Sequence, residues 1–354
     1  MEGKIYDEGM TPTLAFNGVA EESAHVESSS KTQLRLRPEE RGRIAVISNP
    51  RSHRNKHRPL HVPNGVKVVA PATRPDLRRV LDDFVRDGIE LLIIAGGDGT
   101  VRDVLTSGVD VWSGSPEGGG RPQIGVLPCG KTNALAIDLG VPDKWDIADM
   151  IGAWRESRET RRPPLVIDRM GEGRPVLGFL FGAGAFVDAT ELAQTTHRFG
   201  AVNNLAVGIS ILSGIGSTLV GGRHSRWRRG KRMALRFARN VRAHQDAALS
   251  SDGNRFLFVA STMERLPLGI RIFGEPRAGL KTLTVDAMPR RFIRNFIRVL
   301  RGIDTPEMER DGLHRIDAME VEIDLDGGFV LDGERFPAGH YRLREGEPIA
   351  FVTP

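Results

Sequence analysis

The chain has 354 residues, of which 40% are hydrophobic and 27% charged, so it has the composition of a globular protein long enough for two domains. Its formal net charge of +5 at pH 7 is a mild bias toward anionic partners such as nucleotides, phospholipid headgroups or nucleic acid. The single cysteine, Cys129, excludes an internal disulfide framework and favours a reducing compartment, which we expect to be the cytoplasm.

No segment is typical of secretion or of membrane insertion. The N-terminus is acidic and lacks the apolar core of a signal peptide. The longest apolar stretch, 205–220, contains several glycines and is too short to span a bilayer. We therefore expect a soluble protein whose contact with a membrane, if it has one, is peripheral.

The first part of the chain alternates between strand and helix patterns. Residues 1–41 are polar, which predicts a disordered tail. Apolar runs that predict buried strands lie at 44–47, 66–69, 91–95 and 124–127. Apolar residues at helical spacing lie between or after them, at 76–85, 101–105 and 134–139. Such alternation indicates a parallel sheet, so we assign 42–164 to an α/β domain.

The pattern changes after Pro163-Pro164. Short strand-like segments follow at 165–167, 176–181, 256–260, 282–285, 321–325 and the end of the chain. Helical stretches interrupt them at 201–212 and 292–300. We assign 165–354 to a second domain that is mainly antiparallel β.

A glycine-rich loop, Gly96-Gly97-Asp98-Gly99-Thr100, follows the third predicted strand. Consecutive glycines let a ligand approach the backbone, and the N–H groups at the start of the next helix favour a phosphate. Asp98 adds no phosphate affinity, so we expect it to meet Mg²⁺ or a sugar hydroxyl. The alternative is a plain turn between strand and helix.

A second loop, 125–132, fits the pattern G-x-x-x-x-G-K-[ST] of P-loop NTPases. We discount this interpretation because Gly125 lies inside an apolar run, whereas the first glycine of a P-loop ends its strand. Lys131 can still reach a phosphate as a point charge.

Four motifs occur in a fixed order, at 49–52 (Asn-Pro-Arg-Ser), 96–100, 128–136 (Pro-Cys-Gly-Lys-Thr-Asn-Ala-Leu-Ala) and 331–334 (Leu-Asp-Gly-Glu). Together they resemble the diacylglycerol kinase catalytic family, which includes bacterial lipid kinases, sphingosine kinases and ceramide kinases. The resemblance runs from residue 43 to the end. It implies a nucleotide-binding α/β domain of the NAD kinase/diacylglycerol kinase kind and a β-rich domain for the lipid.

The resemblance implies a kinase that uses ATP and Mg²⁺ to phosphorylate a hydroxyl group of a diacylglycerol-like or sphingoid lipid. The nucleotide site that it implies is lined by Asn49, Thr73, Gly96, Gly97, Gly99, Thr100, Gly130, Lys131, Thr132 and Asn133. Asp98 would position Mg-ATP, and Asp188 would lie near the acceptor.

The late Asp332-Gly333-Glu334 stretch would bring carboxylates to the phosphate. We expect Glu334 to be the base that takes the hydroxyl proton, with Asp332 as its partner or as a Mg²⁺ ligand. The alternative for Asp332-Gly333 is a hairpin turn, for which Asp-Gly is a favoured pair.

The chain departs from the family pattern in several places. His53 stands where a glycine is usual, and the 130–133 loop lacks its usual second glycine. Many bacterial members bind a structural Mg²⁺ through an Asp-Asp-Gly-Leu stretch. The matching residues here, 277–281, read Arg-Ala-Gly-Leu-Lys without a carboxylate. We expect that metal to be absent, with Arg277 or Lys281 in place of its charge.

Two basic segments are candidates for contact with an anionic partner. Residues 223–239 carry Lys and Arg without an acidic residue, which suits either anionic headgroups or a solvated face. Residues 290–301 predict a basic amphipathic helix, which lies in a lipid interface or, as we favour, packs on its own sheet. We expect a lipid substrate at a membrane surface and no nucleic acid, and a homodimer stays open.

Two other functions stay open. An NAD kinase-like enzyme would share the first glycine loop, but its Asn-Glu/Asp ribose pair is not found in the second domain. A non-catalytic nucleotide- or lipid-binding relative would explain the altered loop and the absent metal motif. Retention of Asp98 and Glu334 argues against it.

Overall fold

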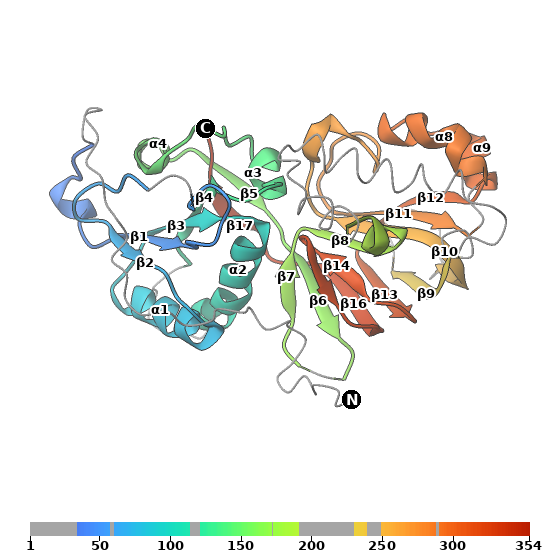
Figure 1. The fold of residues 1–354 in the computed structure, drawn as a ribbon, viewed down its shortest axis with the longest axis horizontal. Helices are drawn as coiled ribbons and strands as arrows, with labels where there is room; N and C mark the ends of the chain where they lie inside the picture. The colour runs from blue at the N-terminus through green and yellow to red at the C-terminus, as the bar shows by residue number, and fades with distance from the viewer. Residues whose placement is uncertain are drawn as a thin grey trace. The chain divides into compact units, whose positions relative to one another are not determined.

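The computed structural model describes residues 34–56, 60–113, 121–171, 173–190, 230–238, 249–287 and 290–354. These residues divide into two compact units (Figure 1). Among the described residues, the α/β unit contains 34–162 together with Pro348–Pro354, and the β unit contains those of Pro163–Glu347.

The α/β unit is built on one sheet, which has six strands in the described residues, in the order β2-β1-β3-β4-β17-β5. The strands are β1 Ile44–Ser48, β2 Lys67–Val69, β3 Leu91–Gly96, β4 Gln123–Pro128, β5 Glu159–Arg162 and β17 Ile349–Val352. Neighbouring strands are parallel except for β5, which is antiparallel to β17. β1 and β3 are almost entirely buried, which explains why their sequences are unbroken apolar runs.

The helices of this unit are α1 Arg74–Arg86, α2 Asp98–Ser113, α3 Ala134–Asp138 and α4 Ile147–Arg155, with a short 3₁₀ helix at Pro38–Glu40. Two of these helices, α1 and α4, begin at a residue whose side chain caps them. Thr73 caps α1 by accepting a hydrogen bond from the Asp76 N–H, and Asp146 caps α4 in the same way. The apolar face of α1, at Leu77, Leu81 and Phe84, is buried.

The β unit contains an antiparallel sheet with eleven strands in the described residues, in the order β15-β14-β8-β10-β9-β13-β16-β6-β7, with β11 paired to β10 and β12. The first strands are β6 Leu165–Arg169, β7 Val176–Gly178, β8 Leu180–Gly184, β9 Lys231–Ala238 and β10 Leu249–Ser261. The later strands are β11 Leu280–Asp286, β12 Leu313–Ala318, β13 Glu320–Leu325, β14 Phe329–Leu331, β15 Glu334–Phe336 and β16 Gly339–Glu345. The α helices α8 Arg290–Leu300 and α9 Pro306–Arg310 and the 3₁₀ helix Pro267–Gly269 complete the named elements.

Aromatic side chains form the centre of the β unit. The Phe329 ring stacks on Phe181 and on Phe336, with ring centroids 4.5 and 5.0 Å apart. These contacts join β14 to β8 and to β15, so the hairpin that carries the last sequence motif is anchored in the core.

A parallel α/β unit followed by an antiparallel β unit confirms the predicted fold class. The boundaries differ from those we predicted. β17, which we assigned to the second domain, lies between β4 and β5 in the first sheet, where Phe351 is fully buried. Residues 34–41, which we assigned to the tail, include the buried Leu36 and Glu40.

Some expectations fall on residues outside those described. The expected helix at 201–212 lies there, as do residues 223–229 and 239 of the basic segment 223–239. Among the described residues, no helix has both the length and the apolar character needed to cross a membrane. In α8, which we predicted as amphipathic, Ile297 is 56% exposed and Val299 is buried.

Candidate functional site

The two glycine loops leave the same edge of the α/β sheet. β3 and β4 pair in parallel, with Gly96 opposite Pro128, so the loops after them start side by side. A Cβ atom on Gly97 would lie 3.0 Å from the Cα of Gly130, and one on Gly130 would lie 2.6 Å from the Cα of Gly97. The backbones are therefore in direct contact, at the carboxyl ends of the strands, where open α/β sheets bind ligands.

The first motif, at the end of β1, is attached to this loop. The Asn49 side-chain Nδ2 donates a hydrogen bond to Thr100 Oγ1 at 2.9 Å, and Asn49 Oδ1 accepts one from the Arg51 N–H. Gly96 leaves space for Thr100, because a Cβ at position 96 would lie 2.5 Å from the Thr100 Cβ. Asn55, which sequence reasoning missed, donates to the carbonyls of Asn49 and Ala95.

Asp98 connects the two loops. It begins α2, and its carboxylate accepts hydrogen bonds from the N–H groups of Ala134 (3.0 Å) and Leu135 (3.2 Å), at the start of α3. Burial raises the pKa of the Asp98 carboxyl, and these donors oppose the rise. Each carboxylate oxygen has two acceptor sites, so Asp98 can cap α3 and still bind a cation.

The second loop is closed by Asn133. Its backbone is left-handed (φ 51°, ψ 44°), a conformation that asparagine tolerates better than most residues. Its Oδ1 accepts from the Gly130 N–H at 2.7 Å and its Nδ2 donates to the Gly130 carbonyl at 3.1 Å. Lys131 is exposed on this loop and Thr132 is partly exposed.

The P-loop interpretation remains unsupported. Gly125 lies within β4, where a Cβ would come within 2.8 Å of Met150 Cγ, so this glycine serves helix packing. Gly99 is the second residue of α2.

A surface pocket lies beside the loops, and several of the predicted nucleotide residues line it. Its lining consists of Ile47, Ser48, Asn49, Pro71, Thr73, Leu77, Thr100, Asp103 and Val104. Thr73, the cap of α1, therefore joins Asn49 and Thr100. A larger pocket at the amino ends of β1, β3 and β4, lined among others by Arg43, Glu90 and Gln123, contains none of the predicted nucleotide residues.

Asp103 is the residue of this pocket that sequence reasoning missed. Its side chain is 5% exposed, and its Oδ1 accepts from Arg102 at 2.9 Å and from Arg74 at 3.5 Å. Its Oδ2 is buried without a hydrogen-bond partner among the described residues. The available signal was its helical spacing from Thr100, which places both side chains on one face of α2.

In the β unit, Asp332 and Gly333 form the turn between β14 and β15. Their φ angles are +48° and +83°, as in the primed turns that Asp-Gly favours. The Asp332 carboxylate accepts hydrogen bonds from the N–H groups of Phe179 (3.1 and 3.2 Å) and Leu180 (2.9 Å). Glu334 is the first residue of β15 and is half-buried. Asp332 and Gly333 therefore form a hairpin turn, and the Asp332 carboxylate fastens the hairpin that carries Glu334.

Asp188 lies in a helical segment, 185–190, that directly follows β8. Its Oδ1 is 3.7 Å from the Nζ of Lys231, the first residue of β9, and both side chains are about one-third exposed. The Asp188 carboxylate therefore lies just after β8 and is paired with a lysine.

The described residues contain no group of three or more His, Cys, Asp or Glu side chains arranged to hold a metal ion. Mg²⁺ that accompanies a nucleotide needs only one or two carboxylates, since the phosphates and water supply the other oxygens. Asp98 fits that requirement.

A parallel sheet with two touching glycine loops at its carboxyl edge is the arrangement in which open α/β sheets bind ligands. Residues 43–162 match the family model described as diacylglycerol kinase catalytic domain. This match covers the first of the two units and agrees with the resemblance that the ordered motifs indicate.

The chain is also similar to known proteins and to a solved structure. The chain is 36% identical over 86 residues to the proteins named probable lipid kinase YegS from Salmonella heidelberg (strain SL476) and Salmonella schwarzengrund (strain CVM19633). The match covers 24% of this chain and 27% of each relative, about a quarter of their length. A crystal structure of a diacylglycerol kinase from Bacillus anthracis str. Sterne has the same fold, with a TM-score of 0.56 at 13% identity, covering 88% of this chain and 97% of that chain.

Proposed function

We propose that this protein is an ATP-dependent lipid kinase that, with Mg²⁺, phosphorylates a hydroxyl group of a diacylglycerol-like or sphingoid lipid at a membrane surface. The observation that carries the proposal is the backbone contact between Gly97 and Gly130, within a domain that matches the diacylglycerol kinase catalytic model. Two glycine loops without side chains at the contact let phosphates approach backbone N–H groups closely.

The nucleotide half of the proposal assigns roles to the residues beside the loops. Asn49, Thr73 and Thr100 line the pocket beside the loops, where we place the nucleoside, and the unpartnered Oδ2 of Asp103 can accept from a hydroxyl or amino group there. Lys131, exposed on the second loop, would neutralise phosphate charge. Asp98 would hold Mg²⁺, which when bound would neutralise charge on the phosphate oxygens.

The acceptor half of the proposal gives Glu334 the role of general base. An alcohol is a weak nucleophile, and a carboxylate that accepts its proton makes attack on the γ-phosphate easier. The hydrogen bonds from Phe179 and Leu180 give Asp332 a positioning role, because they fix the hairpin that carries Glu334. Asp188 would lie near the acceptor, as the family resemblance implies.

The experiment is transfer of γ-³²P from ATP, with Mg²⁺, to a panel of lipids in mixed micelles. The panel contains diacylglycerol, monoacylglycerol, phosphatidylglycerol and sphingosine, and NAD serves as the soluble acceptor. Glu334→Gln and Asp98→Asn test the two carboxylates, and Glu309→Gln, at an exposed glutamate of α9, is the matched control.

A labelled lipid that disappears in both variants and persists in the control would support the lipid kinase and identify its acceptor. Label on NAD alone would instead place the activity with NAD kinases. ATP binding without transfer to any acceptor would contradict the catalytic proposal and leave a nucleotide-binding relative.

A further inference from the structure

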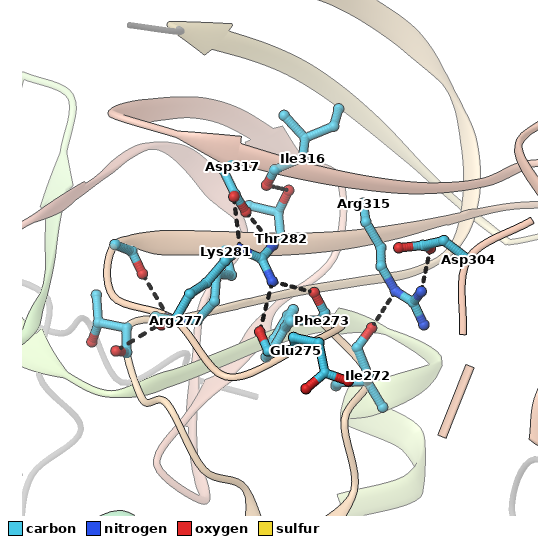
Figure 2. Close-up of polar contacts among 12 residues, drawn as sticks. Ile272, Phe273, Glu275, Arg277, Lys281, Thr282, Asp304, Arg315, Ile316 and Asp317 are labelled. Carbon is cyan, nitrogen blue, oxygen red and sulfur yellow. Dashed lines mark hydrogen bonds and ion pairs between the residues drawn. The ribbon is translucent and has the colours of Figure 1, made fainter. Parts of the chain in front are cut away.

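Three cationic side chains fasten the segment between β10 and β11 (Figure 2). The family resemblance implies a structural Mg²⁺ at residues 277–281 in many bacterial members. They are Arg277 in the segment itself, Lys281 in β11 and Arg315 in β12. Arg315 donates hydrogen bonds to the carbonyls of Ile272 and Val299, which attaches the segment to the end of α8.

Lys281 is the most buried of these cations, at 2% exposure. Its Nζ donates to the carbonyls of Arg277 and Gly279, each at 2.8 Å, and of Thr262 at 3.4 Å. An ammonium group has three N–H donors, and three carbonyl acceptors meet it here. Hard metal ions are held by carbonyl oxygens in the same manner.

Arg277 binds the same segment through its guanidinium group. Its Nη1 donates to the carbonyls of Phe273 (2.8 Å) and Glu275 (3.0 Å), and its Nε and Nη2 bind both carboxylate oxygens of Asp317. This bidentate pair engages both carboxylate oxygens of Asp317 (Figure 2).

The residues present do not fit a structural Mg²⁺. The motif 277–281 supplies no carboxylate, and Asp317 is already engaged by Arg277. A divalent ion at the carbonyls of 277 and 279 would also meet the Lys281 ammonium at hydrogen-bond distance, which is strongly unfavourable for like charges.

We infer that the Lys281 ammonium replaces the structural cation in this chain. Because it is covalently part of β11, it holds residues 277–279 against β10 and β11 without any free divalent ion. The fold of the β unit is then independent of the Mg²⁺ concentration. If the proposed kinase function also holds, on which this last point rests, the Mg²⁺ requirement of the reaction reduces to the ion carried by ATP.

The test is thermal unfolding of the full chain without nucleotide, in EDTA and in millimolar MgCl₂ or CaCl₂. We expect midpoints that agree within about 1 °C, because no metal adds to the folded state. Lys281→Met should lower the midpoint by about 4 °C or more, because three buried carbonyls lose their donor. Lys144→Met, at an exposed lysine, is the matched control and should have no effect.

Chemical rescue makes the test specific to the ammonium group. Lys281→Ala removes a propylammonium unit, so added propylammonium should raise the midpoint of this variant and not that of the wild type. Propanol, which has a similar shape and no charge, should not. A Lys281→Met variant as stable as the wild type would overturn the inference.

The wild-type arm decides the question even if the Lys281 variants fail to fold. A metal-dependent rise of several degrees that persists in Asp98→Asn would place a metal away from the nucleotide loops and overturn the inference. A rise that Asp98→Asn abolishes would assign the metal to those loops and leave the carbonyls of 262, 277 and 279 to Lys281. None of these readouts depends on kinase activity.

Discussion

Gly97 and Gly130 touch through their backbones, although each follows a different strand of the parallel sheet. A Cβ on Gly130 would lie 2.6 Å from the Cα of Gly97 and 2.9 Å from Asn133 Oδ1. Side chains at either position would push the two loops apart and disturb the hydrogen bonds by which Asn133 closes the second loop.

Gly130→Ala should therefore weaken nucleotide binding and stability together. We expect an ATP affinity at least about tenfold lower and a loss of about 1–3 kcal/mol in the free energy of unfolding, as for overpacking elsewhere. Calorimetric titration and urea unfolding measure the two effects.

Gly152→Ala is the control, because Gly152 lies inside α4 and a Cβ there meets nothing within 4 Å. It should stabilise the protein by about 0.5–1 kcal/mol. Equal ATP affinity in Gly130→Ala and wild type would show that the loop contact is not part of the site.

Glu334→Gln and Asp332→Asn should separate chemistry from positioning. Glu334→Gln keeps the shape and removes the base, so we expect transfer to fall by about 10²- to 10⁴-fold with little loss of stability. Asp332→Asn has fewer acceptor sites for the N–H groups of Phe179 and Leu180, which should cost about 1–3 kcal/mol. The ³²P transfer assay measures the loss of chemistry, and urea unfolding measures the loss of stability. Full activity in Glu334→Gln would remove Glu334 from the mechanism.

The Glu40–Arg155 pair should make stability depend on acid pH. Hydrogen bonds from Arg155, at 2.6 and 2.7 Å, hold the pKa of Glu40 below its ordinary value of 4.5. The folded state therefore binds this proton less tightly than the unfolded state. The stabilisation is complete above about pH 5 and is lost as the pH falls through the lowered pKa.

Arg155→Met should flatten the fall in unfolding free energy between about pH 5 and pH 3. Urea titrations at a series of pH values measure this slope. Arg158→Met, which removes an exposed pair with Glu156, is the control and should leave the slope unchanged. An unchanged slope in Arg155→Met would assign the acid sensitivity to other carboxyl groups.

Cys129 should be inert in the folded protein. It is 1% exposed in the turn that follows β4, and burial raises the pKa of its thiol to about 11, against the opposing effect of Arg54. We expect its reaction with a disulfide reagent at pH 8 to be on the order of 100-fold slower than in urea-unfolded protein. Because the folded state disfavours the thiolate, stability should also decline as the pH rises above the ordinary value of 9.0. Rapid labelling under native conditions would show that the second glycine loop opens.

Much of the site was predictable because it is encoded locally. A buried strand that ends in Gly96-Gly97-Asp98 and leads into a helix specifies a ligand loop whatever the rest of the chain does, and Asp332-Gly333 specifies its turn through two positive φ angles. Asp103 and Asn55 were missed because their roles come from neighbours distant in the sequence. Asp103 belongs to the pocket only because β1 and the cap of α1 lie beside α2.

The sequence by itself determined the order of the elements, the α/β and antiparallel character of the two units and the positions of the glycine loops, since period and turn chemistry are local properties. Only the tertiary structure decided that Ile349–Val352 completes the first sheet, because a four-residue apolar strand suits either unit until its neighbours are known. It also decided the partners of charged groups. Folding surrounds the Lys281 ammonium with backbone carbonyls that accept its hydrogen bonds. It also brings the N–H groups at the start of α3 to the Asp98 carboxylate.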